Sequence, residues 1–331
     1  MKITIDESNT NQRFDRFLRK RCKPYPEVRL SDIYSRIRKG DITINGKKAK
    51  EEYKVNIWDE VFIGESLLGK KDPSKLITSK ERKLKKLTKE DIQPIIIFEN
   101  TNRIVFNKPA GIVLHESNKH RNDLSMNDYL ETYAKEYAQG TFKPSFWYRL
   151  DKDTSGVLIG AKNYEALQYL NQIIREREID KTYITLVSGN PPKHFIIEKA
   201  IEKSYNSKFD RAQMIINEKN WMESKTECET IKTIFHSELW QISLMKIKLH
   251  TGRMHQIRIH LASEGYPVLW DIIYGIPAIN RKFNKLLHIN RQLLHCYRYK
   301  FLDHENTTID IKAPLPEDFG KVFGKIDESW F

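Results

Sequence analysis

The sequence predicts an α+β protein with two domains, a small N-terminal α/β unit and a larger domain built on a mixed, largely antiparallel sheet. The chain has 331 residues, of which 39% are hydrophobic and 11% aromatic, enough to bury two cores. Near the N-terminus, two amphipathic helical patterns give way to runs of alternating polarity. Farther along, short β-rich runs alternate with helical patterns, and several connections are too short for a parallel crossover.

The first unit is expected to span residues 1–63. Apolar side chains recur at i, i+3 and i+4 in 14–18 and again in 33–37, which predicts two helices, the second ending at Gly40. Residues 41–44 then alternate with period two and meet Asn-Gly at 45–46, the strongest short hairpin signal. A second extended run closes the unit at 59–63.

Basic side chains lie on the polar face of the second predicted helix and in the hairpin after it. The run RKGDITING at 38–46 and WDEV at 58–61 resemble the S4 RNA-binding domain, a small αL-type fold, with Trp58 in place of its usual glycine. The alternative is an ordinary solvated surface. The resemblance implies RNA contacts by Arg29, Arg36, Arg38, Lys39, Lys47 and Lys48.

Residues 64–91 predict a basic linker. Gly64, Gly69 and Pro73 punctuate a polar stretch that ends in the basic run KERKLKKL at 80–87. This run is either a solvated segment or one that follows RNA phosphates.

The second domain is expected to span residues 92–331. Apolar runs at 95–98, 104–106 and 157–160 predict short strands, and the apolar periodicity of 164–176 predicts an amphipathic helix. This pattern gives the expectation of a mixed, largely antiparallel sheet.

The segment YRLDKDTSG at 148–156 gathers charged residues immediately before a buried strand. Taken alone, it is explained by a turn in which Asp, Ser and Gly serve the backbone geometry. Its order, however, resembles H-R-L-D-x-x-T-S-G, the signature of the RluA-type pseudouridine synthases, with Tyr148 where that family usually has His. Asp151 occupies the place of the family's catalytic aspartate.

Three further segments resemble the same family in the same order. They are NKPAGIVLH at 107–115, KTYI at 181–184 and LHTGRMHQIRIH at 249–260, and together with LHC at 294–296 and AP at 313–314 they extend the resemblance over roughly 92–320. The lack of Gly before Asp271 in YPVLWDIIYG at 266–275, with KEEYKV at 50–55, favours the C-type subgroup, which acts on large-subunit ribosomal RNA.

The resemblance implies a role for each site residue. Asp151 is the nucleophile that assists cleavage of the N1–C1′ bond of uridine, and Arg258 keeps it ionised. Tyr183 lies against the base, where its phenol could accept the C5 proton. Arg149 enters the space that the flipped nucleotide leaves, and on a strand it would share a face with Asp151. Arg253 and His255 are expected to bind substrate or support the loop.

Metal and nucleotide cofactors are not expected. His250, His255 and His260 are spaced by five residues, which would place them on different sides of a helix, and neither Cys nor carboxylate completes a zinc set. Neither G-x-x-x-x-G-K-[ST] nor G-x-G-x-x-G is present in the sequence. The distant cysteines at 22, 228 and 296 predict reduced thiols.

The expected partner is RNA. Lys and Arg number 57 against 44 Asp and Glu, a net charge of +13 that attracts polyanions. The chain has neither a secretory h-region nor a membrane span, so we expect a cytoplasmic monomer that acts on 23S ribosomal RNA or its precursor. The alternatives are the same isomerisation on transfer RNA or at another ribosomal site, and a non-catalytic S4-type assembly factor.

Overall fold

The computed structural model describes residues 1–6, 10–22, 28, 30–64, 84, 86–116, 123–138, 142–206, 211–217, 224–236 and 240–331. The chain divides into two compact units, Met1–Arg82 and Lys83–Phe331. Arg29 and most of the predicted linker, 65–83 and 85, lie outside the described residues. Among the described helices, none is both long and apolar enough to cross a membrane.

The first unit packs two helices on a small antiparallel sheet. Its elements are β1 (Lys2–Thr4), α1 (Phe14–Arg21), α2 (Leu30–Lys39), β2 (Ile42–Ile44) and β3 (Glu60–Ile63), and the strand order is β1-β3-β2. Helix α2 stops before Gly40, whose φ of +90° is the left-handed conformation that ends helices. Asn45 and Gly46 also have positive φ, at 50° and 74°, as a two-residue hairpin turn requires. Both predicted helices and the turn are confirmed.

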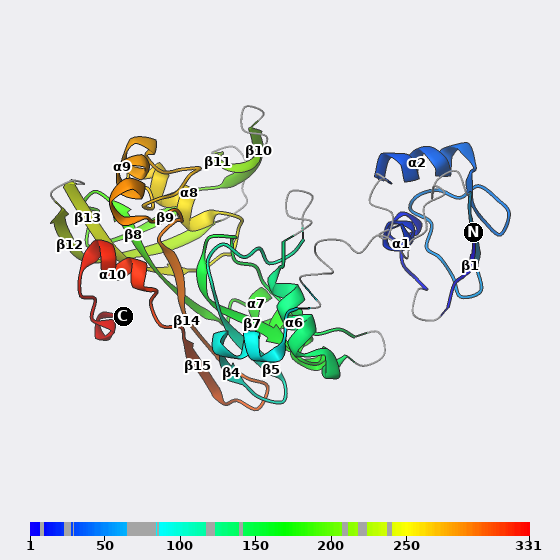
Figure 1. Ribbon diagram of the computed structural model, residues 1–331, viewed down its shortest axis with the longest axis horizontal. Helices are drawn as coiled ribbons and strands as arrows, with labels where there is room; N and C mark the ends of the chain where they lie inside the picture. The colour runs from blue at the N-terminus through cyan, green and yellow to red at the C-terminus, as the bar shows by residue number, and fades with distance from the viewer. Residues whose placement is uncertain are drawn as a thin grey trace. The chain divides into compact units, whose positions relative to one another are not determined.

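The second unit is built on one large sheet (Figure 1). Its strands are β4 (Ile96–Glu99), β5 (Arg103–Lys108), β6 (Ser145–Phe146), β7 (Ser155–Ala161), β8 (Asp180–Ser188), β9 (His194–Glu198), β12 (Lys225–His236), β13 (Trp240–Leu249), β14 (Leu294–Leu302) and β15 (Thr308–Lys312). The order is β4-β5-β7-β14-β8-β13-β12-β9, with β6 beside β7 and β15 beside β14. Among the described strands, β7 and β14 pair in parallel and all other pairs are antiparallel, so the predicted mixed sheet is confirmed.

A separate ribbon and several helices complete the unit. These are β10 (Ile201–Asn206) with β11 (Arg211–Ile216), α5 (Lys89–Ile92), α6 (Met126–Tyr133), α7 (Tyr164–Arg175), α8 (Gln256–Ser263), α9 (Pro277–Leu287), α10 (Glu317–Phe323) and the short 3₁₀ turns η3 (Gln93–Ile95), η5 (Lys135–Tyr137) and η7 (Glu328–Trp330). The predicted helix at 164–176 is α7, with Glu176 as its C-cap. The strand predicted at 95–98 begins one residue later, because Pro94 favours the 3₁₀ turn that precedes it.

Residues 148–156, the signature segment, lead into strand β7, and all seven residues of β7 are buried. Gly156 is required at its start. Its φ is +111°, and a Cβ atom there would lie 2.1 Å from the carbonyl oxygen of Cys296 on β14. Glycine therefore allows β7 and β14 to approach at the point where the signature segment ends.

Strand β8 separates two cores because its side chains alternate between the faces of the sheet. Tyr183 and Val187 join the core that includes α7 and α8. Ile184 and Leu186 join the core that includes α10. Tyr183 is thereby held on the same side of the sheet as α8, the helix that carries Arg258.

Candidate active site

Asp151 lies in an irregular segment between β6 and β7. The buried Lys108 holds this segment through hydrogen bonds to its backbone. Lys108, at the end of β5, donates to the backbone oxygens of Pro109, Lys152 and Thr154 at 2.9, 2.8 and 2.8 Å. Burial lowers the pKa of Lys108 to about 7. Three carbonyl acceptors satisfy the three donors of its ammonium group, so this side chain ties the segment 148–156, at Lys152 and Thr154, to the end of β5.

Arg258 joins two carboxylates that are far apart in sequence. Its Nη1 donates to Asp151 Oδ2 at 2.9 Å, while Nε and Nη2 donate to Asp271 Oδ2 and Oδ1 at 2.6 and 2.9 Å. The Arg258 side chain is only 4% exposed and that of Asp271 is fully buried, whereas the Asp151 side chain is 17% exposed. Asp271 therefore fixes the guanidinium, and Asp151 is the carboxylate of the pair that substrate can reach.

The electrostatics keep Arg258 and Asp271 ionised. Burial alone would lower the pKa of Arg258, but its hydrogen bonds to Asp271 and the charges of Asp271 and Asp151 raise it further above its ordinary value. Burial alone would raise the pKa of Asp271, yet the guanidinium and the backbone amides of Ile273 and Tyr274 hold it below its ordinary value. Asp151 Oδ2 thus accepts its hydrogen bond from a guanidinium that stays positively charged.

His255 stands beside Asp151 as a neutral ring. Burial lowers its pKa to about 4, and its Nε2 is 3.9 Å from Asp151 Oδ2, too far for a hydrogen bond. Its Nδ1 lies 3.0 Å from the Tyr274 hydroxyl, which accepts a bond from the amide of Met214 at 2.7 Å. The arrangement that satisfies the hydroxyl has Tyr274 donating to Nδ1, so the imidazole proton is on Nε2 and points toward Asp151.

Tyr183 lies in the buried part of the site and is 6% exposed. Burial raises its pKa well above 10, so the phenol is protonated at neutral pH. Nearby, the Tyr148 ring stacks on Tyr299 with centroids 4.9 Å apart, and its hydroxyl donates to the backbone oxygen of Val157. Tyr148 thus ties the start of the signature segment to β7 and β14.

Two predicted cations are exposed at the edge of the site. Arg149 lies in an irregular segment, so the expectation that it shares a strand face with Asp151 is wrong. Its charge nevertheless acts on His115 and on His255, which places it near the carboxylate. Arg253 lies in the turn before α8, where its amide donates to Gln256 Oε1 at 3.0 Å.

The three histidines of the third motif have separate environments. His250 follows β13, His255 is the N-cap of α8 with a φ of 55°, and among the three only His260 lies within the helix. His260 is buried against Thr226 Oγ1 and Ser224 Oγ at 2.9 and 3.0 Å. Among the residues that the structure describes, no group of His, Cys, Asp or Glu could hold a metal ion.

The basic residues of the first unit lie around the end of α2. Arg36 forms an ion pair with Asp41 at 2.8 Å. Lys48 donates from Nζ to the Arg38 backbone oxygen at 3.4 Å, which places the hairpin beside the helix end. The side chains of Arg38, Lys39, Lys47 and Lys48 are exposed, and Arg29 lies outside the described residues.

Sequence reasoning gave no structural role to Asp271, Tyr274 or Lys108. Asp271 stood out in the sequence only because Trp270 precedes it in place of Gly. A stronger signal was present, since an acid within the apolar run VLWDII at 268–273 needs a buried cationic partner. The sequence alone could not identify that partner as Arg258.

Comparison with known proteins gives one match to a family model within the second unit and matches to relatives over nearly the whole chain. The family model described as RNA pseudouridylate synthase matches residues 102–263. The protein named ribosomal large subunit pseudouridine synthase C of Vibrio vulnificus is 32% identical over 327 residues, with 97% of this chain and 94% of that protein covered. Its namesake from Buchnera aphidicola (subspecies Acyrthosiphon pisum) is 33% identical, with 98% and 96% covered.

Solved structures extend the likeness to the fold. Human RNA pseudouridylate synthase domain containing 1 superposes with a TM-score of 0.52 and 25% identity, covering 66% of this chain and 82% of that one. Human RNA pseudouridylate synthase domain containing 4 gives a TM-score of 0.54 at 21% identity, covering 70% and 92%, and supports the fold alone. With relatives above 30% identity along almost its full length, the chain belongs to the RNA pseudouridylate synthase family.

Proposed function

We propose that this protein converts specific uridines of large-subunit ribosomal RNA into pseudouridine, with Asp151 as its nucleophile. The observation that carries the proposal is the Asp151 carboxylate, which is partly exposed and held at 2.9 Å by a guanidinium that Asp271 fixes in place. The names of the Vibrio and Buchnera relatives favour large-subunit RNA as the substrate.

The reaction is balanced within the nucleotide. The N1–C1′ bond breaks, the uracil turns, C5 joins C1′, and the proton that leaves C5 is matched by one gained at N1, so neither oxidant nor external energy is required. Asp151 assists as an anion that attacks the nucleoside or stabilises the separated sugar. Arg258 donates a hydrogen bond to the Asp151 carboxylate and holds it in place.

Tyr183 is assigned a contact with the uracil and a hydrogen bond from its phenol. Because burial raises its pKa well above 10, a phenolate that could accept the C5 proton is scarce at neutral pH. The role of base that the sequence left open is therefore less favoured than stacking and orientation of the turned ring.

Arg149, Arg253 and His255 are proposed to surround the flipped nucleotide. Arg149 is exposed near Asp151 and has the planar guanidinium needed to fill the vacated stack. His255 presents an N–H toward Asp151 and can hold a substrate oxygen between them. Arg253 projects from the turn before α8 and is assigned to phosphate contacts.

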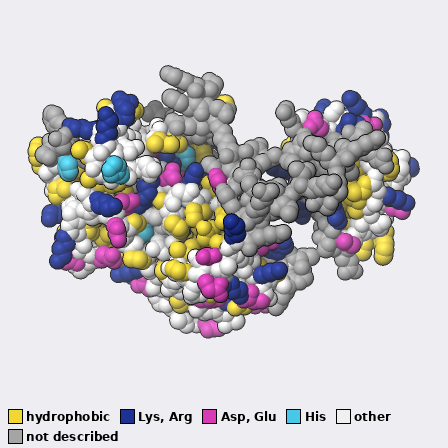
Figure 2. All heavy atoms as spheres, viewed as in Figure 1, with side chains coloured by type: hydrophobic (Ala, Val, Ile, Leu, Met, Phe, Trp, Pro, Cys, Tyr) yellow, Lys and Arg dark blue, Asp and Glu magenta, His cyan; other side chains and the backbone are white. Residues whose placement is uncertain are grey.

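The first unit is proposed to be an S4 domain that holds the RNA through Arg29, Arg36, Arg38, Lys39, Lys47 and Lys48. On the face drawn in Figure 2, Lys and Arg side chains lie scattered among Asp and Glu side chains. Reversing the charge of Lys47 and Lys48 together should weaken RNA binding and flatten its salt dependence, since each phosphate contact releases counterions. An unchanged salt slope would leave the S4 role without support.

The direct test is to map pseudouridines in cellular RNA with and without the gene, and to repeat the mapping with purified protein on unmodified large-subunit RNA. We expect the same uridines to be modified in both. Modification confined to transfer RNA would contradict the substrate. If the gene is required for ribosome assembly while the RNA shows no change in pseudouridine, the protein is the non-catalytic assembly factor instead.

A further inference from the structure

Trp58 is an aromatic residue whose side chain the first unit leaves in solvent. It is 76% exposed, the highest fraction among the described large hydrophobic residues of this unit, of which Phe62 is next at 48%. Among the described residues, none forms a hydrogen bond, a ring contact or a cation–π contact with the indole. The fold of the unit therefore gains little from this ring, and the faces of the ring are open to a ligand.

The backbone of Trp58 has a conformation that glycine favours. Its φ is 71°, in the left-handed region, which is unfavourable for a residue with a bulky side chain. Glycine is also the usual residue at this place in the S4 pattern that the first unit resembles. Strain of this kind is found where the side chain has a function that the fold alone does not require. An exposed indole on a strained backbone therefore indicates a use outside the packing of the unit.

Hydrogen bonds on both sides of Trp58 hold this conformation in place. The Trp58 amide donates to the Ile5 carbonyl oxygen at 2.9 Å, and the Ile5 amide donates to the Asp59 carbonyl oxygen at 2.9 Å. Asp59 is only 7% exposed, and its carboxylate accepts from the Asn56 amide at 2.8 Å and from the Tyr53 hydroxyl at 3.0 Å. The backbone that carries the indole is therefore ordered before a ligand binds, which lowers the entropic cost of binding.

The turn that carries Trp58 is joined to the basic hairpin of the first unit. Asn45, in the hairpin turn, donates from Nδ2 to Asp59 Oδ1 at 2.8 Å, and its Oδ1 accepts from the Glu60 amide at 2.8 Å. The exposed Lys47 and Lys48 follow Asn45 within three residues. Cations that hold phosphates beside an aromatic ring that stacks on bases form the kind of surface that binds single-stranded RNA.

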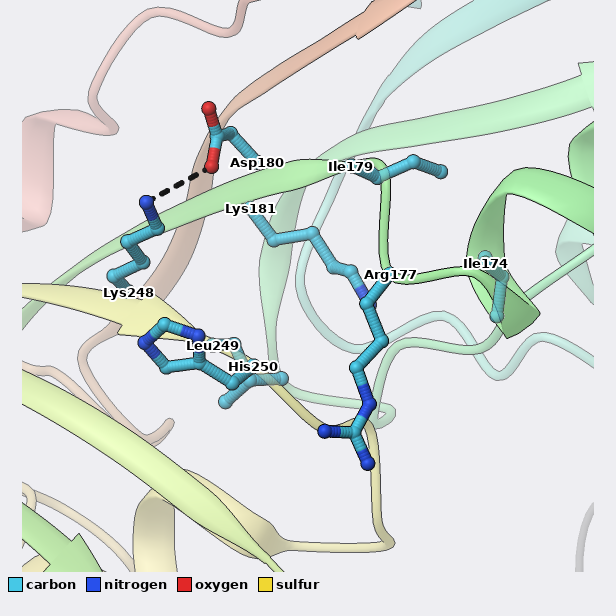
Figure 3. A pocket seen from close by; sticks show the side chains of 8 residues that line it. All are labelled: Ile174, Arg177, Ile179, Asp180, Lys181, Lys248, Leu249 and His250. Atoms are coloured by element: carbon cyan, nitrogen blue, oxygen red, sulfur yellow. Dashed lines mark ion pairs between the residues drawn. The ribbon is translucent and has the colours of Figure 1, made fainter.

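A cavity in the second unit offers no comparable surface for a base (Figure 3). Its volume is about 120 Å³, and Asp180 and Lys248 in its wall form an ion pair at 3.0 Å. Among the described residues that line it, none is Trp, Tyr or Phe. Its lining is charged and aliphatic with one histidine, so the exposed indole of Trp58 is better suited to stacking on a base.

We propose that Trp58 stacks on an unpaired nucleobase of the RNA substrate, while the basic hairpin beside it holds neighbouring phosphates. The inference rests on the proposed function, because it takes the ligand of the first unit to be the RNA that is modified. Charge favours RNA over a protein partner, since residues 1–64 contain 15 Lys and Arg against 10 Asp and Glu. A stack of this kind adds affinity without reading sequence, because every base has a π-face.

The test measures the affinity of the full chain for a labelled single-stranded oligouridine at several KCl concentrations. Trp58→Ala should weaken binding at least roughly 5-fold, which corresponds to about 1 kcal/mol, the lower end for loss of one base stack. Trp58→Tyr keeps an aromatic ring and should bind within about 2-fold of the wild type. Because neither variant loses a charge, the slope of log K against log [KCl] should stay that of the wild type.

Phe235→Ala is the matched control. Phe235 is also 76% exposed, but it lies on β12 of the second unit and its φ is not positive. If Trp58→Ala binds as tightly as Phe235→Ala, the proposal is overturned. It is equally overturned if Trp58→Tyr binds as weakly as Trp58→Ala.

Trp58→Gly separates binding from folding, because it removes the ring and relieves the backbone strain together. It should unfold at the temperature of the wild type or higher, while binding oligouridine as weakly as Trp58→Ala. A protein that is at least as stable and yet binds more weakly has lost a contact with the RNA. If binding by the Trp58 variants falls only in step with a loss of folded protein, the indole has a packing role and the proposal is overturned.

Fluorescence supplies a direct signature of the stack. Trp58→Phe keeps a ring but lacks the indole, so the difference in emission between the wild type and this variant is the emission of Trp58. Saturating oligouridine should quench that difference, whereas inorganic polyphosphate, a polyanion without bases, should leave it unchanged. If oligouridine does not quench it, or if polyphosphate quenches it equally, no base lies on the ring and the proposal is overturned.

The two proposals fail separately. If the Trp58 variants behave as expected but the wild type modifies no RNA, the proposed function fails and the stacking site stands. If the wild type modifies large-subunit RNA but Trp58→Ala binds oligouridine like the wild type, the stacking site fails and the proposed function stands.

Discussion

Replacement of Asp271 by Asn should be among the most damaging single changes in the second unit. The substitution preserves size and leaves an oxygen for the amides of Ile273 and Tyr274, but it removes the charge that faces Arg258. The guanidinium, 4% exposed, then keeps Asp151 as its one ionised partner among the described residues. Loss of one member of a buried ion pair costs about 3–5 kcal/mol, because the other charge stays buried.

The assay is thermal unfolding followed by circular dichroism, and the chain supplies its own control. At about 2–4 °C per kcal/mol for a unit of this size, the melting temperature should fall by about 6–20 °C. Asp310→Asn breaks a pair of similar chemistry, Arg298 with Asp310, whose side chains are 30% and 35% exposed. That control should cost less than about 1 kcal/mol, as surface pairs do.

The dependence on pH follows from the lowered pKa of Asp271. The pKa of Asp271 is lower in the folded than in the unfolded state, where it is about 3.9. Its carboxylate therefore stabilises the fold at a pH above about 3.9, and this stabilisation is lost as the pH falls through the pKa of the folded state. The difference between wild type and Asp271→Asn should therefore be constant near neutrality and shrink below about pH 4. If Asp271→Asn unfolds like Asp310→Asn at pH 7, the argument that Asp271 fixes Arg258 is refuted.

Three further changes test the surrounding structure. Gly156→Ala should destabilise the second unit by more than about 2 kcal/mol in chemical denaturation. Its Cβ would lie 2.1 Å from the Cys296 carbonyl oxygen, and its φ is +111°. A loss of stability below about 0.5 kcal/mol, roughly that of a surface mutation, would contradict the close approach. Trp58→Gly should stabilise the first unit by up to about 1 kcal/mol, because Trp58 has a φ of 71°, which costs a non-glycine residue free energy, while its side chain is 76% exposed. A loss of stability would show that the indole has a packing role. The pKa of His255 is lower in the folded protein, about 4, than in the unfolded chain, about 6.5, so protonation in this range favours unfolding. The wild type should therefore lose stability as the pH falls from about 6.5 to about 4, and His255→Gln should lack this loss. Parallel profiles of stability against pH for the two proteins would count against a neutral His255.

Features set by local patterns could be predicted from the sequence. Helix α7 and the buried strand β7 follow directly from apolar periodicity, and Gly40 and Asn45-Gly46 mark the ends of elements because they tolerate positive φ. The order of strands in the sheet is different in kind. Parallel pairing of β7 with β14 joins residues about 140 positions apart, and no local pattern encodes it.

The candidate site was predicted in part for the same reason. The family resemblance placed Asp151 beside Arg258, and the structure has them 2.9 Å apart. The part of the geometry that depends on folding was missed: Asp271 holds Arg258, Tyr274 orients His255, and Arg149 lies on an irregular segment instead of a strand. These features depend on tertiary contacts and on burial, which also sets the protonation of Tyr183 and His255.

The central claim is that Asp151 is the nucleophile of a uridine isomerisation, and one measurement tests it most directly. Purified wild type, Asp151→Asn and Asp153→Asn are each incubated with unmodified large-subunit RNA, and the rate of pseudouridine formation is measured. Asp153, two residues along the same segment, controls for general loss of charge. We expect the wild type and Asp153→Asn to modify the same uridines, and Asp151→Asn to be at least about a thousand-fold slower. Pseudouridine formation by Asp151→Asn at the wild-type rate would contradict the account.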